Sequence, residues 1–221
     1  FEDDVVTLRN LCFISVEKGN RNFEIHGLVQ LATRKWLDTN NQLRKWRKEF
    51  VMLMAREFPS GSFANWTRCQ VLLPHVAPMF EKEPTEDELL QDWAQVLHNA
   101  GWYLWMKGQY IWAESVARKA VKTRERIVGQ DTASTLNSVS ILALVLQGQG
   151  NYEAAEAMNR RALEGREKAL GKEHPDTLAS VYCLAYLLHH RHRYEEAMLL
   201  YKRASSGYTT TLGLDHPTTQ A

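Results

Sequence analysis

Hydrophobic residues recur at helical spacing through the second half of the chain. In the stretch 131–172, the apolar and small positions fall three or four residues apart: Leu136, Val139, Leu142, Ala143 and Leu146. This spacing predicts a first helix of about 16 residues. Two glycines within Gly148–Asn151 then favour a turn. A second amphipathic stretch runs from Tyr152 to Leu170, and Gly171 is typical of the residue that ends a helix. The pattern predicts a helical hairpin.

The same pattern returns at steps of 42 residues. The aligned residues include a tyrosine, a glycine and a small residue in each unit: Tyr110, Tyr152 and Tyr194; Gly129, Gly171 and Gly213; Gly101, Ala143 and Ala185. Such a period predicts a solenoid in which each hairpin covers its neighbour. We expect three units, 85–130, 131–172 and 173–214, and the start of a fourth. An uncapped last unit is expected to continue into further repeats or to self-associate.

Composition sets few limits on function. The 221 residues are 44% hydrophobic and 24% charged, with a net charge of +1, so no bulk field favours nucleic acid or lipid. Residues 39–80 hold six Lys/Arg against two Asp/Glu, which we interpret as a solvated helix face. The three cysteines form no close pair, and no signal peptide or long apolar run occurs, which predicts a cytoplasmic protein. No catalytic or metal-ligating set has workable spacing, so we predict no enzyme.

The repeat resembles tetratricopeptide repeats, specifically the 42-residue type of kinesin light chains. The stretches that carry the resemblance are 136–139, 150–156 and 161–163, together with the His174–Pro175 junction. Unit three departs from it at His192, where the other units have Gly108 and Gly150. Unit one instead begins after Thr85–Glu88, a capping-box pattern. The resemblance implies an all-α, right-handed superhelical solenoid whose first helices line the concave side.

By the same analogy, ten residues are candidates for binding a protein or peptide on the concave side: Gln95, His98, Trp102, Trp105, Asn137, Ser140, Leu144, Tyr182, Tyr186 and His189. Aromatic anchors with amide and imidazole groups suit an extended peptide or a docked helix. The alternative is that the tryptophans and tyrosines only pack against neighbouring hairpins. The run His189–His192 contains three histidines, but a solvated helix end explains it better than a metal site.

Residues 1–38 follow a different pattern. A short helix over Val5–Cys12 is predicted to end near Ser15, a turn to occupy 16–22, and a strand to occupy 23–25. An amphipathic helix follows from His26. Helix, turn, strand and helix in this order predict the C-terminal part of a winged-helix subdomain. Residues 39–84 are then two connecting helices, packed on the array as a degenerate hairpin.

The stretch 23–32 resembles the end of the winged-helix subdomain in nucleotide-switch NTPases of the NB-ARC (STAND) class, which include fungal NOD-like receptors. That family has a Met-His-Asp triplet here, and the resemblance implies that His26 senses bound nucleotide. This chain departs from the triplet at Ile25 and Gly27. A helix cap is the alternative role for His26. The chain contains no phosphate loop, so ADP or ATP is implied only for an upstream domain.

Two functions remain open. The first is a ligand-sensing module of a STAND receptor in signal transduction and innate immunity, and the winged-helix pattern favours it. The alternative is a free-standing cargo adaptor of the kinesin-light-chain kind. DNA binding is disfavoured, because residues 1–38 sum to a charge of −1.

Overall fold

The computed structural model describes residues 2–11, 13–16 and 23–213, and its contacts group the chain into residues 1–50 and 51–221. Helices make up most of the described chain, so the predicted all-α fold is confirmed. The three-part division at residues 38 and 84 stays a prediction. So does the start of a fourth repeat, because residues 214–221 lie outside the described part. Within the described part, no helix combines the length and apolar character of a membrane span.

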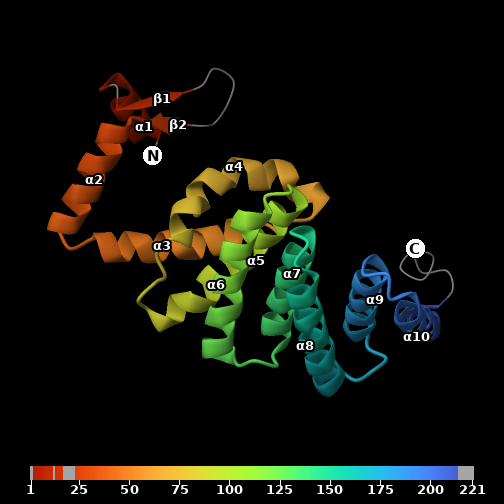
Figure 1. The fold of residues 1–221 in the computed structure, drawn as a ribbon. Helices are drawn as coiled ribbons and strands as arrows, with labels where there is room; N and C mark the ends of the chain where they lie inside the picture. The colour runs from red at the N-terminus through yellow and green to blue at the C-terminus, as the bar shows by residue number, and fades with distance from the viewer. Residues whose placement is uncertain (1, 12, 17–22, 214–221) are drawn as a thin grey trace. The chain divides into compact units, whose positions relative to one another are not determined.

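Residues 1–50 contain helix α1 (Glu2–Asn10), strands β1 (Ile14–Val16) and β2 (Phe23–Ile25), and helix α2 (Gly27–Thr39) (Figure 1). The strands pair antiparallel, with Ile14 opposite Ile25. The predicted helix end near Ser15 is wrong, because α1 ends at Asn10. Ile14–Val16 is extended instead, since its β-branched residues alternate with a serine and pair with β2. The predicted turn falls largely on residues 17–22, outside the described residues, and the winged-helix assignment stays a prediction.

Helix α2 has an apolar face that is largely exposed. None of its residues is buried, and Leu28 and Leu31 are 69% and 62% exposed. Among the side chains described in β1 and α2, only Ile14 is buried. Because an amphipathic helix is normally stabilised by burying its apolar stripe, this unit holds little core of its own.

Helix α3 (Leu43–Glu57) leads into the larger unit, where η1 (Phe63–Asn65), α4 (Trp66–Val76) and η2 (Ala77–Phe80) precede the repeats. Three contacts fasten this segment to α5 (Asp87–Met106). The Asn99 amide donates to the Phe58 carbonyl at 3.0 Å, and the Trp93 indole donates to the Met79 carbonyl at 2.9 Å. A Cβ on Gly61 would lie 2.3 Å from a backbone nitrogen of α5, so this turn requires glycine.

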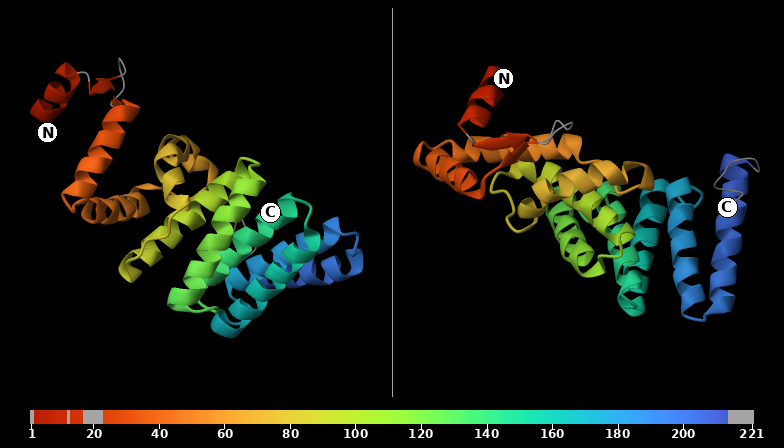
Figure 2. Two further views of the ribbon diagram at one scale, coloured as in Figure 1. Left: turned by 60° about the vertical axis from the view of Figure 1, so that its left-hand side comes forward. Right: turned by 90° about the horizontal axis from the view of Figure 1, so that it is seen from above.

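The repeats form three stacked hairpins. After α5, their helices are α6 (Tyr110–Val128), α7 (Ala133–Gly148), α8 (Tyr152–Leu170), α9 (Pro175–His190) and α10 (Tyr194–Leu212). Figure 2 shows the hairpins α5/α6, α7/α8 and α9/α10 succeeding one another along the array. Each second helix has 19 residues and begins at the aligned tyrosine. The predicted hairpin of residues 131–172 is therefore confirmed.

The links between hairpins repeat in atomic detail. The Thr135 hydroxyl donates to the Gly129 carbonyl at 2.7 Å, and 42 residues later Thr177 donates to Gly171 at 2.8 Å. Both glycines have a positive φ, as the sequence predicted. Pro175 opens α9 as expected. The predicted capping box at the start of α5 is wrong: Glu86 is the N-cap and makes no side-chain cap bond, since Thr85 bonds to the Glu86 carboxylate instead.

His192 keeps the backbone of the glycines that it replaces. Its φ is 61°, against 72° and 78° at Gly108 and Gly150. A side chain in this region is strained, and the His192 ring lies 2.7 Å (Nδ1 to hydroxyl) from Tyr194, a contact that holds it in place.

Packing inside the hairpins depends on matched pairs of large and small residues. A Cβ added to Gly165 would lie 2.7 Å from Leu136, and one added to Gly207 would lie 2.5 Å from Leu178. The aligned pair in the first hairpin is Thr123 with Ala94, in which the larger residue has changed sides. Because interiors are closely packed, the two leucines leave no room for a Cβ at Gly165 or Gly207.

Candidate partner-binding surface

α5 contacts α7 directly, whereas neither the second helices α6 and α8 nor the next two first helices, α7 and α9, share a comparable interface in the described chain. The side on which the first helices lie is the inner side that the repeat pattern predicts. The ten candidate residues come from this side, at aligned positions of α5, α7 and α9.

In the first hairpin the candidates serve the architecture. Gln95, His98, Trp102 and Trp105 are all half-buried. The turn at Gly61 lies against Trp102, with the Trp102 Cγ 2.8 Å from the position of a Gly61 Cβ. Packing on the preceding segment, the alternative that the sequence left open, therefore holds for Trp102.

Buried arginines join neighbouring hairpins through two of the candidates. Arg124 of α6 donates to Gln95 Oε1 at 2.6 Å and to Ser138 Oγ at 2.7 Å. One period later, Arg166 of α8 donates to Asn137 Oδ1 at 2.6 Å and to Ser180 Oγ at 2.5 Å. We call these two groups the arginine staples. The bonds to Ser138 and Ser180 reach the next hairpin, and the amide oxygens of Gln95 and Asn137 hold each arginine in place within its own hairpin.

The first staple also affects the pKa and the contacts of His98. Burial lowers the pKa of Arg124 to about 10, so the guanidinium remains charged at neutral pH. Burial, and secondly the charge of Arg124, lower the pKa of His98 to about 4. His98 is thus neutral near pH 7, with its Nδ1 3.3 Å from the Ser138 hydroxyl. Ser140, the aligned residue in α7, donates to the Leu136 carbonyl of its own helix.

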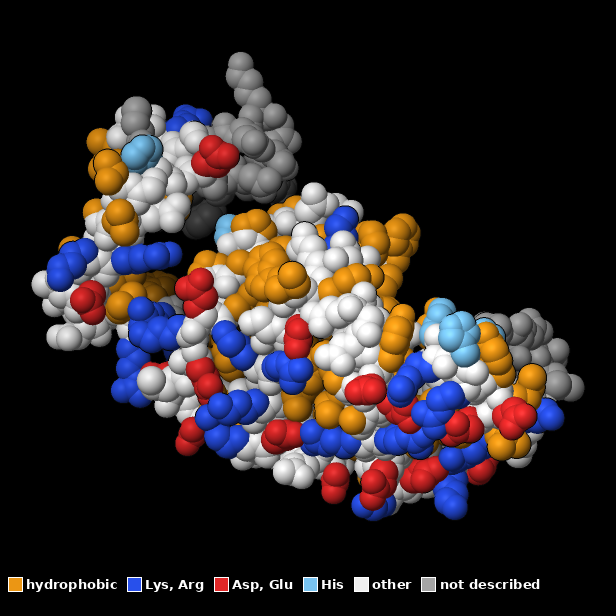
Figure 3. All heavy atoms as spheres, in the orientation of Figure 1, with side chains coloured by type: hydrophobic (Ala, Val, Ile, Leu, Met, Phe, Trp, Pro, Cys, Tyr) orange, Lys and Arg blue, Asp and Glu red, His pale blue; other side chains and the backbone are white. Residues whose placement is uncertain are grey.

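The third hairpin differs, because its candidates are exposed. Tyr182 is 47% exposed and Tyr186 is 43% exposed, and His189 is exposed as well. Leu144 and Trp102, which align with Tyr186, are half-buried. Figure 3 shows the histidines gathered over the end of α9, beside hydrophobic side chains.

These side chains belong to a larger set of rings, which we call the aromatic cluster: Tyr182, Tyr186, His189, His190, His192, Tyr194 and Tyr201. Its rings meet edge to face; Tyr186 and His190 have centroids 4.4 Å apart, and Tyr182 and Tyr201 5.5 Å apart. The sequence missed the role of Tyr194 and Tyr201. The sequence does contain one signal for this role: Tyr201 is a large aromatic residue at a position where the other two units have Ala117 and Asn159.

The arginines beside the aromatic cluster are already paired. Arg193 bonds both Glu156 and Glu196, and Arg191 bonds Glu156 at 2.5 Å. Burial opposes the charge of Glu156, yet the hydrogen bonds from Arg160 and Arg193 outweigh it and lower the Glu156 pKa. Arg191 and Arg193 are therefore already neutralised by glutamates at the edge of the cluster. Among the described residues, no group of three acidic, Cys or His side chains could hold a metal ion.

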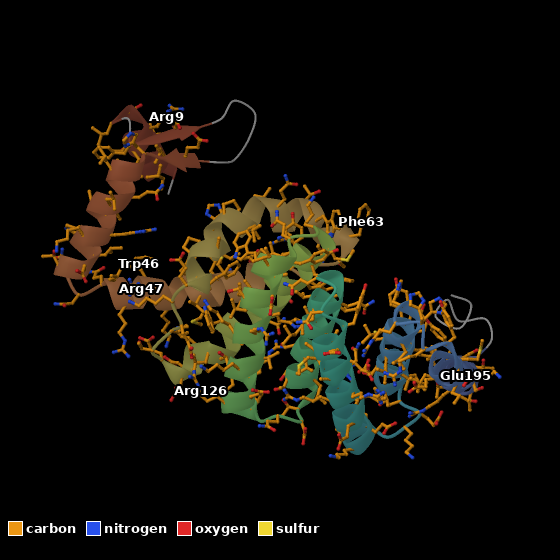
Figure 4. The ribbon with its side chains drawn as sticks, in the orientation of Figure 1. Arg9, Trp46, Arg47, Phe63, Arg126 and Glu195 are labelled. Atoms are coloured by element: carbon orange, nitrogen blue, oxygen red, sulfur yellow. The ribbon has the colours of Figure 1, made fainter. Side chains whose placement is uncertain are left out.

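His26 acts as the N-cap of α2, the alternative role left open by the sequence. Its Nδ1 accepts a hydrogen bond from the Leu28 amide at 3.3 Å, which leaves Nε2–H as the donor of the neutral ring. His174 caps α9 in the same way, through the Asp176 amide. His26 also lines a hollow of about 510 Å³ together with Arg9, which is labelled in Figure 4.

Comparison with known proteins identifies the array. Models of the tetratricopeptide repeat family match residues 93–134 and 131–218. Residues 93–218 are tetratricopeptide repeats. A nucleotide-binding leucine-rich repeat (NLR)-like protein of Hyaloscypha variabilis is 32% identical over 134 residues, which are 61% of this chain and 14% of the relative. This chain therefore matches only a small part of that relative's length.

Two crystal structures of nearly identical TPR-like repeats, from a Podosopora anserina protein assigned to the kinesin light chains, are also similar to this chain. They are 17% and 18% identical, cover 82% and 81% of it and 93% of their own chains, and have TM-scores of 0.49 and 0.48. The tetratricopeptide-repeat array is a protein-interaction module.

Proposed function

We propose that the array binds a peptide or protein partner through the aromatic cluster of the third hairpin, as part of a fungal STAND receptor of innate immunity. The exposure of Tyr182 and Tyr186 at aligned positions of α9, and of the neighbouring Tyr194 at the start of α10, is the observation that carries the first half of the proposal. Large aromatic side chains dominate the binding energy of interfaces because they bury much area at little entropic cost. The name of the NLR-like relative supports the second half.

The cluster suits a partner with apolar side chains better than a strongly charged one. Its own members carry no fixed charge, and the neighbouring arginines are occupied by Glu156 and Glu196. The tyrosine hydroxyls and imidazole nitrogens add hydrogen bonds that fix the register of a bound segment. Such a surface fits an extended peptide or one face of a helix.

Peptide selection on the intact chain tests the binding site. A random peptide library displayed on phage should yield binders whose affinity falls at least about tenfold when Tyr186 is replaced by Ala, as for an anchoring aromatic. Lys202→Ala, an exposed substitution on α10, serves as the matched control. Binders that lose affinity equally with both variants, or with neither, would place the binding surface elsewhere.

We further propose that His26 contacts the phosphates of ADP or ATP held by a nucleotide-binding domain in the whole receptor. The hollow beside it contains Arg9, and a guanidinium with an imidazole N–H is a donor set that fits phosphate oxygens. In the whole receptor, His26→Ala should accelerate release of ADP. His174→Ala removes a cap of the same geometry from α9 and should leave ADP release unchanged. If both variants change the rate of ADP release equally, His26 acts only as a helix cap.

A further inference from the structure

A second hollow lies on the outer side of the first hairpin, away from the aligned inner positions. It measures about 640 Å³ and lies between η2 and α6, lined by Ala77, Pro78, Phe80, Glu81, Trp112, Ser115 and Lys119. Trp112, Ser115 and Lys119 recur at helical spacing, so they form one face of α6. Phe80 and Trp112 meet edge to face, with centroids 5.7 Å apart, and form an apolar wall.

The other two hairpins serve as internal controls for this surface. Ile111 is 86% exposed and Trp112 is 38% exposed. The residues that align with Ile111 are Glu153 and Glu195, which are what an exposed first turn normally carries. The next position, Trp112, aligns with Ala154 and Glu196, so the first hairpin places two large hydrophobic side chains where the other two hairpins carry acidic or small residues. An exposed apolar group of this kind, beside a hollow, is typical of an interaction site.

The position of Lys119 also differs between the hairpins, in the ion pair that its side chain forms. Arg161 pairs with Glu125, and Arg203 pairs with Glu167, each at 2.6 Å and each across a hairpin junction. Lys119 aligns with both arginines, yet its Nζ donates to the Phe80 carbonyl at 2.5 Å. Glu83, the carboxylate one period before Glu125, bonds to Arg126 instead. Within the described chain, no carboxylate neutralises Lys119 as in the other two hairpins.

We propose that this outer hollow binds a partner segment that presents an apolar side chain beside a carboxylate. The apolar side chain packs against Phe80 and Trp112, and the carboxylate pairs with the half-buried ammonium of Lys119, which retains two further N–H donors. Glu81 on the rim can accept a backbone N–H of the same segment and disfavours a second acid there. The site is separate from the aromatic cluster, so one array can hold two partners or two parts of one partner.

Indole-3-propionate is a suitable probe, because it combines an apolar ring with a carboxylate. In two-dimensional NMR spectra of the intact chain, it should shift amide signals of residues 77–81 and 111–119 saturably, with a Kd in the millimolar range typical of a fragment. Indole-3-propionamide has the same shape without the charge, and it should bind at least about fivefold more weakly, as loss of a charge-assisted bond implies.

Variants then separate the two halves of the site. Lys119→Gln should remove the preference for the acid over the amide, whereas Lys122→Gln, on the same helix, should keep it. Ile111→Glu introduces, at an exposed position, the residue type of the other two hairpins, so the variant should fold normally. Its added negative charge should weaken binding of indole-3-propionate relative to the wild type. Trp112→Ala should abolish binding of both probes.

The results also distinguish this site from the proposed binding at the aromatic cluster. Tyr186→Ala should leave the shifts at residues 111–119 unchanged, whatever it does to peptide binding. Equal affinity for acid and amide, no saturable shift at these residues, or shifts confined to the aromatic cluster would each overturn the proposal.

Discussion

The first and third hairpins use the same repeat positions for opposite purposes. In the first, Gln95 and His98 belong to an arginine staple, and Trp102 lies under the turn at Gly61. In the third, Tyr182 and Tyr186 occupy the aligned positions and are exposed. The arginine of the staple is also replaced: Arg124 and Arg166 in the first two hairpins align with Tyr208 in the third. A repeat position therefore predicts where a side chain lies, and its neighbours decide whether it stabilises the array or remains available for a partner.

The largest expected effect contrasts two aromatic residues at one repeat position. Trp102→Ala should lower the free energy of unfolding by about 3 kcal/mol, because it removes a large, well-packed side chain. Tyr186→Ala should cost under about 1 kcal/mol, since its ring is 43% exposed. Urea unfolding followed by circular dichroism measures both. Similar losses would mean that Tyr186 is a packing residue after all.

The next effect concerns the staple. Arg124→Met should cost about 2 kcal/mol, because it leaves Gln95 and Ser138 without their buried donor. The control is Arg118→Met on the same helix, where the guanidinium is exposed and pairs with Glu114 four residues earlier. Such surface pairs contribute about 0.5 kcal/mol. If the two variants unfold at the same urea concentration, the staple adds no stability beyond a surface pair.

The smallest effect is a dependence on pH. His98 has a pKa of about 4 when folded and an ordinary value of 6.5. The unfolded chain therefore takes up more protons between these values, and stability falls as the pH falls from about 6.5 to about 4. Because His98 is partly buried, its share is about 2 kcal/mol or less. His98→Asn should therefore lose less stability than the wild type between pH 7 and pH 4.5; parallel losses would contradict the assigned pKa.

The 42-residue period predicted most of the helical hairpins and the residues at which they begin and end. Tyr110, Tyr152 and Tyr194 begin second helices, and the glycines at 129, 171 and 213 all take a positive φ. These features depend on local spacing, capping and backbone freedom, which a sequence expresses directly. The N-terminal unit was less predictable, because the short segment Ile14–Val16 became a strand only by pairing with β2.

The site was only partly predictable, because exposure depends on which neighbour covers a side chain. Sequence spacing placed Gln95, Trp102 and Tyr186 on one inner side, but could not show that Arg124 binds the first or that Gly61 lies against the second. Nor could it bring Tyr201 of α10 to Tyr182 of α9. The sequence by itself determined the hairpins, their period and their inner positions. The tertiary structure decided which of those positions stayed exposed, because contacts between helices join residues some 30 to 40 positions apart, as Arg124 with Gln95 and Lys119 with Phe80.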